Sequence, residues 1–78
     1  MPPATPSPIG GPADGLAASS ALRAMADRLE DAEVERAMRD GWSWSQVAEA
    51  LGVTRQAVHK KHLKRLLAAR IDLRRRNA

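Results

Sequence analysis

Residues 46–63 read QVAEALGVTRQAVHKKHL, and this stretch decides the fold. Apolar residues recur at helical spacing on both sides of Gly52, which favours two short helices joined by a tight turn. Gly52 suits the turn because a positive φ costs little without a Cβ atom. Ala48 is small enough for the two helices to cross at close range. The apolar wedge expected between them consists of Val47, Leu51, Val53 and Val58.

Hydroxyl side chains mark where each of these helices begins. Residues 43–46 read SWSQ, which fits a capping box in which Ser43 and Gln46 satisfy two backbone N–H groups. Thr54 is expected to cap the last helix. That helix meets no Gly or Pro afterwards, so we expect it to run for some 20 residues. Because no stretch alternates apolar and polar residues at period two, the sequence predicts an all-α fold.

The phrase GWSWSQVAEALGVTRQAVHKKH, residues 41–62, resembles the helix-turn-helix of homeodomain-like DNA-binding modules, with the motif itself at 43–63. Such modules occur in recombinases, sigma-factor-type domains and small actinobacterial DNA-binding proteins. The resemblance implies that the last helix is a long recognition helix for the major groove. One position departs from the family, because Lys61 stands where an aliphatic residue is usual. Either Lys61 lays its methylene stem over the core, or His62 takes the core position instead.

The resemblance also implies which side chains contact DNA. The residues expected to read base edges are Arg55, Gln56, His59 and Lys60, since Arg and Lys can donate to guanine and Gln can bond bidentately to adenine. The residues expected to bind phosphate are Lys61, Lys64 and Arg65, with Arg74, Arg75 and Arg76 near the end of the chain. Three hydroxyl residues could also donate to phosphate or act only as helix caps: Ser43, Ser45 and Thr54.

Charge is distributed unevenly along the chain. Residues 1–53 hold four basic and eight acidic side chains, whereas residues 54–78 hold nine basic side chains and a single acid, Asp72. The positive end therefore begins where the proposed recognition helix begins, as expected of a protein that meets a polyanion. The 78 residues contain no cysteine, which excludes a disulfide framework and a thiolate zinc site. His59 and His62 alone make a poor metal site, so no metal or other cofactor is expected.

Two segments precede the motif. Residues 1–13 are rich in Pro and Gly and are expected to form a disordered tail, with the helix-turn-helix domain over 14–78. A helix over roughly 15–30 carries Ala18, Leu22, Met25 and Leu29 on one stripe. The next apolar set, Val34, Ala37 and Met38, points about 150° away. Either the helix breaks near residues 30–31, where Asp31 could cap a second helix to Asp40, or one long helix serves two partners.

The last helix carries a core stripe that includes Val58, His62 and Leu66. Beside it lies a second apolar stripe of Leu63, Leu67 and Ile71, which favours association. Packing could occur within one chain or between two, and we favour a homodimer. Its expected interface residues are Leu22, Met25, Leu29, Leu63, Leu67 and Ile71. Trp42 and Trp44 are expected to anchor the small core rather than to stack on bases.

These observations predict a protein that binds double-stranded DNA, as a nucleoid-associated or architectural protein or a small transcriptional regulator. The alternative is a protein-interaction adaptor that docks on a polymerase or protease complex. No enzymatic activity, small-molecule ligand or membrane partner is expected, because no catalytic constellation and no stretch of ~18 apolar residues is present. The expected location is the cytoplasm, at the nucleoid.

Overall fold

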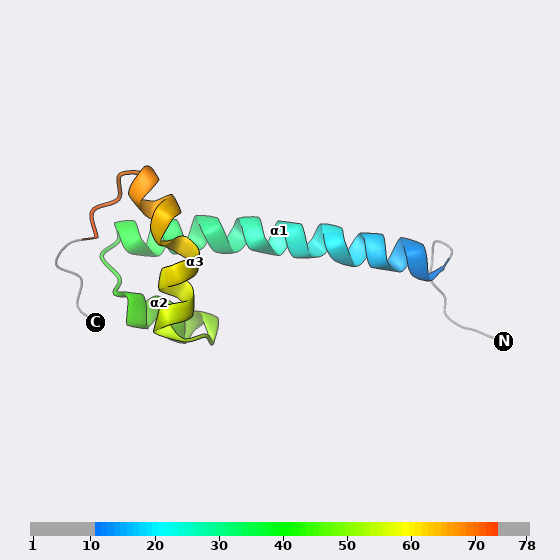
Figure 1. The fold of residues 1–78 in the computed structure, drawn as a ribbon, viewed down its shortest axis with the longest axis horizontal. Helices are drawn as coiled ribbons and strands as arrows, with labels where there is room; N and C mark the ends of the chain where they lie inside the picture. The colour runs from blue at the N-terminus through cyan, green and yellow to red at the C-terminus, as the bar shows by residue number, and fades with distance from the viewer. Residues whose placement is uncertain (1–10, 74–78) are drawn as a thin grey trace.

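The computed structural model describes residues 11–73, which form three helices and no strand (Figure 1). The helices are α1 at Pro12–Arg39, α2 at Trp44–Leu51 and α3 at Arg55–Ala68. The all-α prediction is confirmed. Residues 1–10 of the predicted tail and Arg74–Arg76 lie outside the described residues. Over the described range, no helix is long and apolar enough to cross a membrane.

The first helix is continuous, so of the two alternatives one long helix is confirmed and a break near residues 30–31 is wrong. It begins at Pro12, inside the segment predicted as tail, because proline suits the first position of a helix. Nothing between Leu16 and Asp40 disfavours a helix strongly, since the segment contains neither Gly nor Pro. Figure 1 shows that the N-terminal half of α1 extends well beyond α2 and α3.

The second helix begins and ends as its local sequence predicts. The Gln46 backbone N–H donates to Ser43 Oγ at 3.1 Å, and the Ser43 backbone N–H donates to Gln46 Oε1 at 2.8 Å. This pair is the predicted capping box. At the other end Gly52 takes a left-handed φ of 73°, and the Val53 N–H donates to the Ala48 carbonyl at 3.0 Å. The tight turn before α3 is therefore confirmed.

The core lies where the C-terminal half of α1 meets α2 and α3. Its buried apolar side chains are Val34, Met38, Trp44, Val47, Ala48, Val58, Leu66 and Ile71. Leu51 and Val53 belong to the predicted wedge but are exposed, since they flank the turn at the edge of the contact between α2 and α3. Trp44 anchors the core as predicted, with 6% of its surface exposed, whereas Trp42 is 41% exposed. The Trp42 backbone N–H donates to the Ala37 carbonyl at 3.0 Å, and Trp42 lines a hollow between α1 and α2.

The third helix ends at Ala68, earlier than predicted. Arg70 takes a left-handed φ of 60°, and the Ile71 N–H donates back to the Leu66 carbonyl at 3.1 Å. This is a Schellman ending without its usual glycine. Burying an Ile side chain is worth about 1.5–3 kcal/mol, whereas a non-glycine residue in this conformation costs roughly 1–2 kcal/mol. Ile71 therefore turns into the core of its own chain, and its predicted place in a dimer interface is wrong.

Replacing Arg70 by glycine is expected to stabilise the fold, because glycine adopts the left-handed conformation without steric cost. We expect the free energy of unfolding to rise by about 0.5–1 kcal/mol and the melting temperature by roughly 2–8 °C. Thermal and urea unfolding followed by circular dichroism measure both. The matched control is Lys64→Gly in the right-handed interior of α3, which should destabilise by about the same amount. Two changes of the same sign would contradict the proposed ending.

Candidate nucleic-acid interface

The third helix has one buried face and one face open to solvent. Val58, His62 and Leu66 face the core. On the opposite side Gln56, Lys60 and Lys64 are exposed and follow one another at intervals of four residues, so they form a single line of side chains. We call these three residues the outer row. Arg55 is exposed in the first turn of α3, beside the start of this row.

The start of α3 is held rigidly. Thr54 Oγ1 accepts a hydrogen bond from the Ala57 backbone N–H at 3.0 Å, which confirms the predicted cap. Ala57, which is not among the residues predicted to contact DNA, is exposed and borders the outer row. Its methyl group is the kind of side chain that contacts a thymine methyl in a major groove. The sequence feature that could have identified Ala57 is a small residue directly after Gln56.

His59 lies at the edge of the outer face. Its ring is half-buried and meets Trp44 edge to face, with ring centroids 4.9 Å apart and planes at 67°. The contact fixes the imidazole against a core residue and leaves it between the buried face and the outer row. Of the four residues predicted to read bases, Arg55, Gln56 and Lys60 therefore project freely, and His59 is held at the side.

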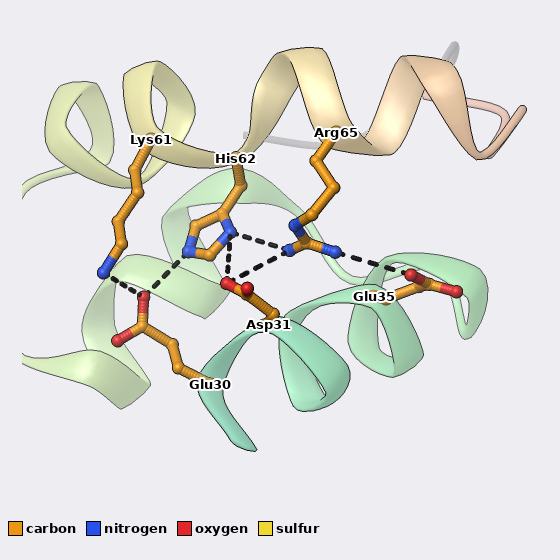
Figure 2. A network of polar contacts seen from close by, with 6 residues as sticks. All are labelled: Glu30, Asp31, Glu35, Lys61, His62 and Arg65. Carbon is orange, nitrogen blue, oxygen red and sulfur yellow. Dashed lines mark hydrogen bonds and ion pairs between the residues drawn. The ribbon is translucent and has the colours of Figure 1, made fainter. Parts of the chain in front are cut away.

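Two cations predicted to bind phosphate face α1 instead. Lys61 Nζ lies 3.0 Å from Glu30 Oε2, and Arg65 Nη1 lies 3.4 Å from Glu35 Oε1 (Figure 2). The structure thus places Lys61 and Arg65 in intramolecular ion pairs, and their contact with phosphate stays a prediction. No local pattern indicates these ion pairs, because the carboxylates lie about 30 residues earlier and only the fold brings them beneath α3.

His62 lies at the centre of this network and is fully buried. Its Nε2 is 2.8 Å from Glu30 Oε2, and its Nδ1 is 2.8 Å from Arg65 Nη2. A neutral imidazole with the proton on Nε2 satisfies both contacts, because Nε2–H donates to Glu30 and Nδ1 accepts from Arg65. Of the two ways to accommodate Lys61, His62 has taken the core position. The network fixes the rotation of α3 on α1 and so determines which side chains form the outer row.

The pKa of Glu30 lies below its ordinary value of 4.5, chiefly because His62 and Lys61 hydrogen-bond to its carboxylate. A lowered pKa in the folded chain stabilises the fold above the unfolded pKa, and this contribution is lost as the pH falls through the lowered value. Wild type should therefore lose its stability advantage over Glu30→Gln as the pH falls from the ordinary pKa of 4.5 through the lowered value. Urea unfolding at several pH values measures it. Glu49→Gln, on the exposed side of α2, is the control and should follow the wild type throughout.

The hydroxyl residues separate by burial. Ser43 is 3% exposed and its Oγ is used by the cap of α2, so its predicted role in binding phosphate is wrong. Ser45 is half-buried in the first turn of α2, and Thr54 is exposed. Both can still donate to a phosphate that approaches the two helix N-termini. In the described part of the chain, no three His, Asp or Glu side chains gather in a way that could hold a metal ion.

The cations of α3 are thus divided between two faces. Lys61 and Arg65 pair with carboxylates of α1. In contrast, Arg55, Lys60 and Lys64 form no ion pair with any residue in the range 11–73. Positive charge that is exposed and uncompensated attracts a polyanion. Together with the amide of Gln56, the outer row presents donors suited to base edges and to phosphates.

Comparison with known proteins identifies a matching family and several similar sequences. A family described as Homeodomain-like domain matches residues 21–74. Uncharacterized proteins from Mycobacterium bovis and from two strains of Mycobacterium tuberculosis are each 37% identical over 59 residues, which is 76% of this chain. The chain spans about a quarter of their length, since the match covers 23% of each. No solved structure shows a significant match.

Proposed function

The chain belongs to the homeodomain-like domain family of DNA-binding helix-turn-helix domains, and on this premise we propose that α3 reads a short duplex motif from the major groove. Arg55, Gln56 and Lys60 contact base edges, with His59 beside them. The phosphates on either side are bound by Lys64, Thr54 and Ser45. Arg74–Arg76, beyond the described residues, keep their proposed role on the backbone of the duplex.

The observation that carries this proposal is the division of charge on α3. If all its cations served only the fold, they would face the carboxylates of α1, as Lys61 and Arg65 do. Lys60 and Lys64 instead form no ion pair with a carboxylate in residues 11–73 and share a row with Gln56. Such a row on one helix is what a major groove accommodates.

In the cell, we propose that the protein acts at chromosomal DNA as a nucleoid-associated protein or a small transcriptional regulator. Genome-wide mapping of binding sites separates the two roles. A small number of promoter peaks supports a regulator, whereas thousands of sites that share a short motif support an architectural role.

A salt titration tests DNA binding directly. If about four or five phosphates are neutralised per chain, the logarithm of the association constant should fall with the logarithm of salt at a slope of roughly −4. Lys64→Ala should reduce the steepness by about 1, because it removes one phosphate contact. Arg23→Ala, an equally exposed arginine on α1, is the control and should leave the slope unchanged. Fluorescence anisotropy between about 50 and about 200 mM salt measures these slopes, and a slope near zero overturns the proposal.

Most of the apolar surface that the alternative adaptor role requires is not exposed in the structure. That role requires an exposed stripe of Leu63, Leu67 and Ile71, but Ile71 is buried and Leu63 is packed partly against the core. Leu67 remains exposed, close to the outer row. One leucine is too little apolar area for a stable protein interface, and this favours DNA as the partner of α3.

A further inference from the structure

The N-terminal half of α1 carries an apolar face that residues 11–73 leave uncovered. Leu22, Met25 and Leu29 are 64%, 56% and 63% exposed. The helix buries its opposite side, at Val34 and Met38, against the rest of the domain. At 100° per residue, the two faces point about 170° apart. Within residues 11–73, nothing on α2 or α3 can therefore reach the exposed face.

The exposed face has the spacing of a coiled-coil seam. Its residues are Ala18, Leu22, Met25, Leu29 and Ala32, separated in turn by four, three, four and three positions. This alternation is the a/d pattern of a heptad repeat, which supercoils two helices around each other. A face built only to pack in a globular core would show a broader stripe. The remaining exposed leucine of this segment, Leu16, lies on the other side of the helix.

The charges beside the seam indicate the partner and its direction. When the seam residues occupy a and d positions, Arg28 is a g position and Glu33 is the e position that follows it. In a parallel pair of identical helices, each g residue lies beside the following e residue of the other helix. Arg28 of each copy would therefore meet Glu33 of the other, which lies 3.7 Å from Arg36 on its own helix, so the charges beside the seam are complementary in a parallel pair of this same helix. Both side chains are exposed in the single chain.

We propose that two copies of this chain pair through α1 as a parallel coiled coil over residues 18–32. The second and third helices pack on the side of α1 opposite the seam, so the seam remains open along its whole length. Parallel pairing places both copies of α3 at the same end of the coiled coil, because α2 and α3 lie at the C-terminal half of α1 (Figure 1). The use of this dimer to read two half-sites rests on the proposed function, but the dimer itself does not.

Sedimentation equilibrium of the full chain, without DNA, tests the pairing. We expect a dimer whose population increases with protein concentration, and a dissociation constant at least 100-fold weaker in Leu22→Glu/Leu29→Glu. The control is Leu16→Glu, which makes one such substitution at a leucine of similar exposure outside the seam and should leave the dissociation constant unchanged. A wild type that remains monomeric at every concentration overturns the proposal. Equal effects of the seam and control substitutions also overturn it.

Two further variants test direction. Because the chain has no cysteine, Ala18→Cys introduces a single thiol in the seam. In the parallel pair the two thiols lie opposite each other and should form a disulfide under mild oxidation, whereas an antiparallel pair separates them by about 20 Å. Arg28→Glu and Glu33→Arg should each weaken the dimer several-fold, and the double reversal should restore it. Failure of both the cross-link and the rescue overturns the parallel direction.

The two proposals fail independently. Arg55→Ala/Gln56→Ala should lose DNA recognition and keep the same dimer dissociation constant, because both residues lie on α3, away from the seam. The seam variant should still bind a single half-site, more weakly than wild type binds a paired site. A chain that dimerises but binds no DNA would overturn the proposed function and leave the coiled coil intact.

Discussion

A chain carrying Arg55→Ala and Gln56→Ala is expected to keep its three helices and lose its preference for a specific DNA sequence. Both residues are exposed in the first turn of α3, outside the buried core. A well-formed contact to a base edge contributes about 1–3 kcal/mol to discrimination. Losing two should therefore weaken binding to the preferred duplex between roughly 30-fold and roughly 10,000-fold, which approaches the level of non-specific binding.

The measurement is a competition between a duplex selected from a random library with the wild-type protein and a duplex of unrelated sequence. The matched comparison is Lys64→Ala, which also removes an exposed side chain from α3 but should weaken binding to both duplexes alike. Circular dichroism confirms that the helices remain. A double variant with undiminished preference would contradict the assignment of these residues to base edges and favour an adaptor role.

Leu66→Ala is expected to unfold much of the protein. Leu66 is fully buried, and its carbonyl accepts the hydrogen bond from Ile71 that closes the end of α3. Removing a buried leucine side chain costs about 2–5 kcal/mol, because a cavity remains where the surrounding atoms cannot follow. A core of this size supplies only about 3–5 kcal/mol in total. The substitution therefore removes most of the stability of the domain.

Urea unfolding of two control variants identifies the cause. Leu66→Met preserves volume and should cost less than about 1.5 kcal/mol. Leu16→Ala removes the same atoms from a side chain that is 71% exposed, so its effect should stay within about 0.5 kcal/mol. If Leu66→Ala were no more harmful than Leu16→Ala, the core would not lie where the structure places it.

Local signals predicted the helix-turn-helix well. Ser43, Gln46 and Thr54 cap helices through hydrogen bonds that span three residues, so neighbours along the chain are enough to predict them. Gly52 likewise needs only its own lack of a side chain to make the turn. The same locality explains why α2 and the start of α3 agree with the prediction to within a residue.

Structural features that depend on residues far apart in the sequence were predicted less well. The sequence showed two apolar faces on the first helix but left open whether the chain breaks between them, because periodicity alone does not name the partner of each face. The outer row was only partly predicted for the same reason. Lys60 and Lys61 are neighbours of like charge, and nothing near them in the chain says which one faces Glu30.

By itself, the sequence determined the helical class, the positions of the caps and the turn, and the basic character of α3, since each follows from spacing within about four residues. Only the tertiary structure decided three further features. Ile71 ends α3 because its burial outweighs the left-handed conformation of Arg70. His62 and Arg65 face Glu30 and Glu35 because folding brings carboxylates from 30 residues away beneath α3. With Lys61 and Arg65 held against α1, charge and burial leave Lys60 and Lys64 facing outward, where they can meet DNA.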